Sequence, residues 1–121
     1  MSEKFSIKKR IDSFSYAIKG LKLFFKTQHN SWIHIVATIL AVTLGFYLKL
    51  NSTEWLAIIF VSGLVFVTEI INTAIEYLTD HVSPQYHEQA GKVKDLAAAA
   101  VLFASIIAVI TALIVFLPKL L

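Results

Sequence analysis

Three apolar segments, each long enough to cross a lipid bilayer, dominate this 121-residue sequence. A helix rises 1.5 Å per residue, so about 20 residues cover the roughly 30 Å of bilayer hydrocarbon. Residues 31–50, 55–79 and 96–117 meet this requirement and are predicted to span the membrane. The composition agrees, because 57% of the residues are hydrophobic and only 16% are charged. The predicted fold class is an all-α integral membrane protein with three transmembrane helices.

The first 30 residues form a basic segment ahead of these spans. Apolar residues recur there at steps of three and four, which predicts an amphipathic helix: Ile11, Phe14, Ile18, Leu21 and Phe25. This helix is too charged to span, so it either lies at the cytoplasmic interface or folds against the protein's own bundle. The predicted organisation is an interfacial helix in residues 1–30 followed by a three-span core in residues 31–121.

The distribution of basic residues predicts the orientation in the membrane. Seven of the eleven lie before residue 30, namely Lys4, Lys8, Lys9, Arg10, Lys19, Lys22 and Lys26. Cytoplasmic flanks carry such clusters, so the N-terminus is expected inside and, after three spans, the C-terminus outside. The cluster favours anionic lipid headgroups, and no nucleic-acid partner is expected.

Local signals predict where the last two helices begin and end. Ser83-Pro84 is expected to end the second span, and Gly91 to precede the third. Pro118 is expected to end the third span. The chain has no cysteine, so thiolate chemistry is excluded and any metal must use oxygen or imidazole ligands.

A row of polar side chains interrupts the second apolar segment. Glu69, Asn72, Glu76 and Asp80 fall within roughly 80° of one another on a helix. A carboxyl group in hydrocarbon costs several kcal/mol unless it meets a partner, a metal or water, so aligned carboxyl groups indicate a functional site. The alternative is that the row serves only to pack the helix against polar neighbours.

The polar loop after this segment adds groups that suit an anion. Tyr86, His87 and Glu88 are followed by Lys92, Lys94 and Asp95, close to the start of the third span. Cation ligands and phosphate-binding groups therefore converge on one end of the protein, as phosphoryl transfer requires. No GxxxxGK[ST] or GxGxxG pattern occurs, and each loop residue could instead anchor the loop or fix the topology. The residues alone do not choose between a kinase and an ion pathway.

Two strings resemble the signature of the prokaryotic diacylglycerol kinase and undecaprenol kinase family. They are EIINTAIEYLTD, from Glu69 to Asp80, and YHEQAGKVKDLAAAAV, from Tyr86 to Val101; Lys19-Gly20-Leu21 and the three-span plan extend the similarity over the chain. The resemblance implies a homotrimer in a bacterial cell membrane, with composite active sites on the cytoplasmic side. It also implies transfer of the γ-phosphate of ATP to a lipid hydroxyl with Mg²⁺ as cofactor.

The resemblance also implies roles for individual residues. Glu69 matches the general base, Glu76 a metal-binding carboxylate, and Asn72, Lys94 and Asp95 the polar active-site partners. The implied nucleotide-contacting positions are Lys9, Tyr16, Gln28, Glu76, Gln85, Tyr86, His87, Lys94 and Asp95. Phe14, Glu69 and Ala98 are the implied lipid contacts.

One position departs from the family pattern. Gln28 occupies the place of a second metal-binding glutamate, and an amide oxygen can ligate Mg²⁺ but supplies no charge. An inactive assembly protein therefore stays open as an alternative, as does a proton or cation conduit along the Glu69 row. The strings HNSWIH and FLPKLL are similar to the undecaprenol kinase branch, so undecaprenol is the favoured lipid alcohol and diacylglycerol the alternative.

Overall fold

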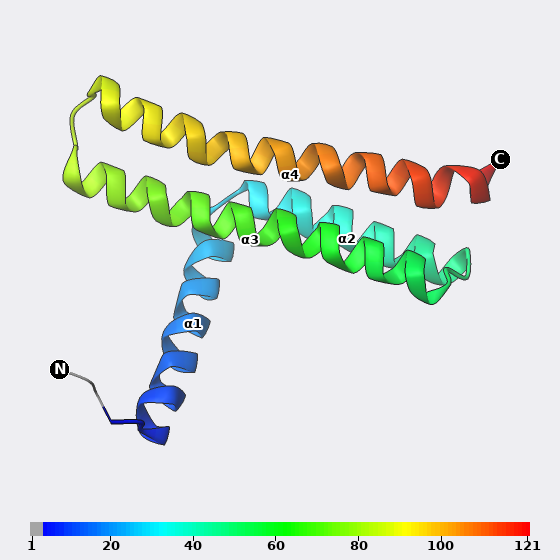
Figure 1. Ribbon diagram of the computed structural model, residues 1–121, viewed down its shortest axis with the longest axis horizontal. Helices are drawn as coiled ribbons and strands as arrows, with labels where there is room; N and C mark the ends of the chain where they lie inside the picture. The colour runs from blue at the N-terminus through cyan, green and yellow to red at the C-terminus, as the bar shows by residue number, and fades with distance from the viewer. Residues whose placement is uncertain (1–3) are drawn as a thin grey trace.

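The computed structural model describes residues 4–121 and shows four α-helices (Figure 1). They are α1 (Ile7–Thr27), α2 (Asn30–Tyr47), α3 (Ser52–Val82) and α4 (Glu88–Leu120). Within the described residues, α2, α3 and α4 are the helices long and apolar enough to cross a membrane. The predicted all-α fold, with an N-terminal helix and three candidate spans, is confirmed.

The three spans differ in length, and this difference positions the site. Helices α3 and α4, of 31 and 33 residues, lie side by side and antiparallel (Figure 1). Helix α2 has only 18 residues and lies along the N-terminal part of α3. The junction between α1 and α2 therefore meets α3 near its middle. Helix α1 projects away from the bundle at this junction, and Phe24 is its buried residue.

The turn between α2 and α3 is closed by two capping motifs. The N–H of Leu50 donates to the carbonyl of Gly45 (3.1 Å) and the N–H of Lys49 to that of Phe46 (3.3 Å), which is a Schellman motif. Lys49 takes the left-handed conformation (φ 56°) that this motif requires. The side chains of Asn51 and Glu54 then form a capping box at the start of α3. The short connection therefore fixes the register of α2 against α3.

The apolar core lies at this end of the bundle. Leu50, Ile58, Val115 and Phe116 are buried together. The Trp55 ring lies so close to Gly45 that a Cβ there would stand 2.7 Å from it. An ion pair between Lys119 and Glu54 (3.2 Å) joins the end of α4 to the start of α3.

The opposite end of the bundle differs in part from the sequence predictions. Helix α3 ends at Val82, as Ser83-Pro84 predicts, but α4 already begins at Glu88, where His87 Nδ1 accepts a hydrogen bond from the N–H of Gln89 (3.2 Å). The expectation that Gly91 precedes this helix is wrong, because the helix, capped by His87, begins three residues before Gly91. Lys94 and Asp95 consequently lie on a helix.

The expectation that Pro118 ends α4 is also wrong, because the helix continues to Leu120. A proline in the final turn removes one backbone hydrogen bond, and the N–H of Leu121 still donates to the carbonyl of Leu117 (3.2 Å). The helix therefore reaches the level at which Lys119 meets Glu54.

Candidate functional site

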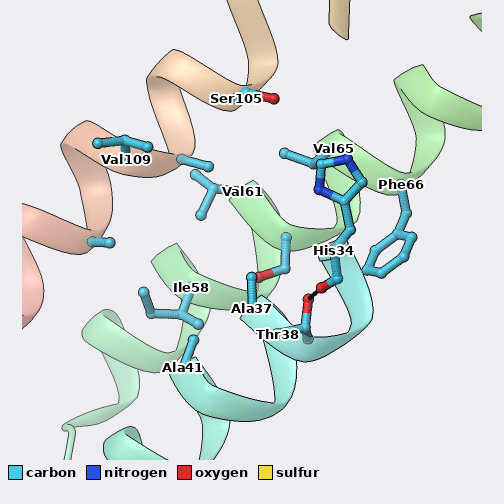
Figure 2. Close-up of a pocket in the computed structure, with 13 residues that line it drawn as sticks. His34, Ala37, Thr38, Ala41, Ile58, Val61, Val65, Phe66, Ser105 and Val109 are labelled. Atoms are coloured by element: carbon cyan, nitrogen blue, oxygen red, sulfur yellow. Dashed lines mark hydrogen bonds between the residues drawn. The ribbon is translucent and has the colours of Figure 1, made fainter. Parts of the chain in front are cut away.

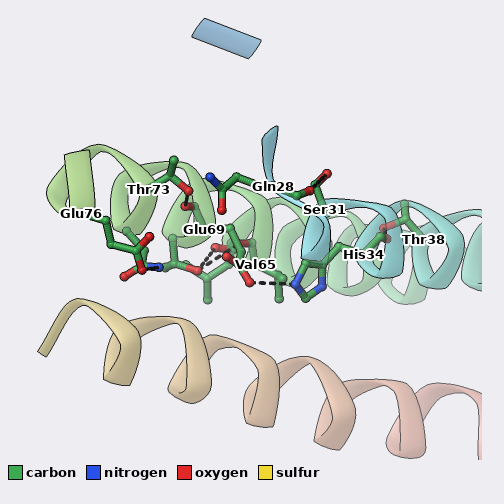
Figure 3. Close-up of polar contacts among 11 residues, drawn as sticks. Gln28, Ser31, His34, Thr38, Val65, Glu69, Thr73 and Glu76 are labelled. Carbon is green, nitrogen blue, oxygen red and sulfur yellow. Dashed lines mark hydrogen bonds and ion pairs between the residues drawn. The ribbon is translucent and has the colours of Figure 1, made fainter. Parts of the chain in front are cut away.

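The polar row of α3 is the centre of the candidate site. Figure 3 shows Glu76, Glu69 and His34 following one another along one side of this helix. Asn72, between the two glutamates in sequence, donates through Nδ2 to Glu76 Oε1 (3.2 Å). The side chain of Glu69 is only 12% exposed. Asp80, the last member of the predicted row, is exposed near the end of α3.

Glu69 has a partner on α2. Its Oε1 lies 2.9 Å from His34 Nε2, and both side chains are largely buried (Figure 3). Sequence reasoning missed this contact, although an ionisable residue within an apolar span is itself a sign of function. Since His34 lies one turn from the start of α2, Glu69 is level with that start, and α3 continues for more than three turns beyond it.

Asn72 also presents an unsatisfied atom. Its Oδ1 is buried and has no hydrogen-bond partner in the part of the chain that the structure describes. Such an atom costs free energy unless a donor or a cation reaches it. An amide oxygen and a carboxylate are ligands that a hard divalent ion prefers, although Asn72 turns its Nδ2, and not its Oδ1, toward Glu76.

Gln28 lies at the α1–α2 junction (Figure 3). Its backbone carbonyl accepts hydrogen bonds from the Ser31 hydroxyl (2.6 Å) and the Ser31 N–H (3.1 Å), and this serine is buried. The Gln28 side chain is partly buried, and its Nε2 lies 3.5 Å from Thr27 Oγ1. The described residues form no group of three or more His, Cys, Asp or Glu side chains that could hold a metal ion.

Lys94 does not approach Glu69. Its ammonium instead forms an ion pair with Asp80, which ties the first part of α4 to the last part of α3. Asp95, the next residue on α4, is exposed. In the single chain, therefore, Lys94 neutralises the end of the polar row, whereas Asp95 is separate from it.

The remaining predicted contacts are spread over the surface of the chain. Tyr86 is 90% exposed in the loop, and Gln85, His87 and Ala98 are also exposed. Lys9, Phe14 and Tyr16 lie on α1, which projects from the bundle (Figure 1). One chain alone does not gather these groups around Glu69.

A cavity of about 300 Å³ lies between α2, α3 and α4, on the core side of His34 (Figure 2). Its wall is mainly apolar, with Ala37, Val61 and Val65 among the lining residues. Thr38, Ser62 and Ser105 contribute hydroxyl groups, and the Thr38 hydroxyl is engaged by the His34 carbonyl (2.7 Å). Hydrocarbon can occupy such a space, while charged groups lie beyond it along α3.

Comparisons with known proteins agree with this arrangement. The family described as prokaryotic diacylglycerol kinase matches residues 15–116. The undecaprenol kinase of Bacillus subtilis is 36% identical over 108 residues, which cover 89% of this chain and 88% of that protein.

Two diacylglycerol kinases are similar as well. That of Synechocystis is 40% identical over 110 residues, covering 90% of this chain but 63% of that longer protein. That of Escherichia coli K12 is 37% identical over 101 residues, covering 84% of this chain and 83% of that protein.

Proposed function

Because this chain belongs to the prokaryotic diacylglycerol kinase family and is a lipid kinase with membrane-spanning helices, we propose that it phosphorylates undecaprenol with ATP. The observation that carries the proposal is the order of groups along α3. A largely buried carboxylate, Glu69, is followed by the Asn72–Glu76 pair. The lipid hydroxyl would thus lie beside Glu69, and the phosphates would lie further along the same helix, beside Asn72 and Glu76.

Glu69 is the proposed general base. Its level, near the start of α2, is the level at which a lipid hydroxyl at the membrane surface would arrive. As the hydroxyl oxygen bonds to the γ-phosphorus, its proton passes to the Glu69 carboxylate, and the bond from phosphorus to the ADP oxygen breaks. The products are the lipid phosphate and ADP.

Glu76 and Asn72 are the proposed holders of Mg²⁺. They lie about 5 to 10 Å of helical rise beyond Glu69, away from the cavity. The buried, unpartnered Asn72 Oδ1 and the adjacent carboxylate fit a small hard cation, with Gln28 offering a further amide oxygen. When bound, Mg²⁺ would neutralise charge on the transferring phosphates, and with one carboxylate it would keep several of its waters.

ATP binding is proposed to require more than one subunit. The implied nucleotide contacts lie on α1 and on the 83–87 loop, and Asp95 is exposed on α4. A homotrimer would let α1 or α4 of one subunit complete the row of another. In this arrangement Lys9, Tyr16, Gln85, Tyr86, His87, Lys94 and Asp95 would surround the nucleotide, and Phe14 and Ala98 would contact lipid.

The proposed orientation places this site in the cytoplasm. Helices α3 and α4 are roughly 45 to 50 Å long, more than 10 Å longer than the bilayer hydrocarbon is thick. The end of α3 that carries Glu76 and the end of α4 that carries Lys94 extend beyond the start of α2. Single cysteines at Ser2 and Leu121 provide the measurement. In intact cells, a membrane-impermeant thiol reagent is expected to label only the cysteine at position 121. Labelling of position 2 alone would place the site outside the cell.

We propose undecaprenol, and not diacylglycerol, as the first candidate substrate for two reasons. The match to the undecaprenol kinase covers nearly the whole of both chains, and HNSWIH, which includes His34, resembles that branch. Diacylglycerol is the second candidate because the Synechocystis and Escherichia coli kinases are equally similar in identity.

A lipid panel tests the preference. Purified protein in mixed micelles with Mg²⁺ and radiolabelled ATP is expected to phosphorylate undecaprenol with kcat/KM at least about 10-fold above that for diacylglycerol, a difference of about 1.4 kcal/mol. A Glu69→Gln sample run in parallel controls for contaminating kinases. A preference for diacylglycerol would assign the second candidate, and label in neither lipid would contradict the proposal.

A further inference from the structure

The hydrogen bond between His34 and Glu69 connects two helices at the level of the proposed chemistry. The Nε2–Oε1 distance of 2.9 Å is that of a well-formed hydrogen bond, and the side chains are only 22% and 12% exposed. A carboxylate so placed has lost most of its water and depends on fixed donors.

The imidazole is itself held in place. Its ring packs edge-on against Phe66, with 6.2 Å between centroids and 73° between planes. Phe66 in turn contacts Phe25 of α1 at 6.3 Å. One turn further along α2, the Thr38 hydroxyl donates to the His34 carbonyl (2.7 Å). His34 is therefore a fixed donor on a packed helix.

Other cations do not substitute for it. Lys94, which the family resemblance implies as an active-site partner, forms its ion pair with Asp80 instead of Glu69. The α4 residues that line the cavity beside His34 are Ser105, Ala108, Val109 and Ala112, of which none is titratable. Within residues 4–121, His34 is the ionisable side chain that pairs with Glu69.

We propose that His34 is a positioning residue that holds the Glu69 carboxylate in the orientation needed to accept the proton of the lipid hydroxyl. The inference rests on the proposed role of Glu69. His34 Nε2–H donates to Oε1, which leaves Oε2 to face the incoming hydroxyl. The bond also stabilises the ionised carboxylate among apolar side chains until the proton arrives.

Three variants test this role in the full-length protein. His34→Leu removes the donor and keeps an apolar side chain of similar size, so kcat is expected to fall about 10- to 100-fold while the KM for ATP stays near that of the parent. His34→Gln keeps an N–H donor near the Nε2 position and is expected to recover most of the lost kcat. His81→Leu replaces an exposed histidine in the last turn of α3 and is expected to leave kcat unchanged.

A double-variant comparison separates positioning from packing. If His34 acts through Glu69, adding His34→Leu to Glu69→Gln should lower kcat by less than about 2-fold further, because the two residues act as one unit. Thermal unfolding and the elution volume in detergent are measured for every variant. His34→Gln controls for folding, since it keeps a polar side chain at the same position.

The outcomes are distinct. Normal kcat in His34→Leu, or equal losses in His34→Leu and His34→Gln, would overturn the positioning role while Glu69→Gln still tests the base. If His34→Leu lowers kcat by the same factor in the Glu69→Gln background as in the parent, His34 acts in another step. Normal kcat in Glu69→Gln would overturn the proposed base and the inference together.

Discussion

Glu69→Gln is expected to lower turnover by about 100-fold or more while the protein still binds ATP with near-parent affinity. Glutamine keeps the size of the side chain and its hydrogen bond to His34, but it cannot accept the proton of the lipid hydroxyl. The nucleotide side of the site, at Asn72 and Glu76, is left intact. Transfer of radiolabelled phosphate to lipid in micelles measures turnover, and equilibrium nucleotide binding is measured separately.

Glu54→Gln is the matched control for this prediction. Glu54 is a carboxylate at the other end of the same helix, where it contacts Lys119 and caps α3. Its replacement should lower the unfolding temperature slightly and leave turnover unchanged. If Glu69→Gln instead weakened ATP binding as much as turnover, Glu69 would be a ligand of the nucleotide or metal rather than the base.

The polar row was predictable because it depends on one helix. The spacing of Glu69, Asn72 and Glu76 fixes their shared side whatever the helix packs against. The three spans were predictable for a similar reason, since length and apolar composition set them locally.

The contacts between helices were not predictable from these local rules. The pairing of His34 with Glu69 depends on the register of α2 against α3, which the Schellman turn at Lys49 and the fit of Trp55 onto Gly45 establish. Lys94 meets Asp80 because α4 begins at Glu88, several residues before its apolar stretch. The sequence shows Lys94 near the row but not which carboxylate it meets.

The distance of Glu69 from the membrane surface also depends on how the helices pack. Counting residues from Asp80 places Glu69 roughly 16 Å inside the second span. The short α2, however, begins level with Glu69, and the last turns of α3 extend past that point. The relative lengths of α2 and α3 therefore bring the proposed base near the surface at which α1 leaves the bundle.

Glu76→Gln is expected to cause the second large loss, about 100-fold or more in kcat/KM at ordinary Mg²⁺ concentrations. Glu76 is the carboxylate that accepts a hydrogen bond from Asn72 Nδ2, and Gln28 adds no charge. The proposed Mg²⁺ site would then contain only neutral protein oxygens, so the ion would be held chiefly by ATP phosphates. Raising Mg²⁺ should restore part of the activity, whereas it should restore none in Glu69→Gln.

Gln28→Glu adds a carboxylate, whereas Glu76→Gln removes one, and it tests whether residue 28 binds the same Mg²⁺. In the parent background it should lower the Mg²⁺ concentration for half-maximal activity and raise kcat/KM. In the Glu76→Gln background it returns one carboxylate to the site and should recover part of the loss. Identical Mg²⁺ titrations in both backgrounds would show that position 28 does not contact the metal. A parent that is inactive until Gln28 is replaced would identify this glutamine as an inactivating change, because the added carboxylate alone would then supply the missing charge.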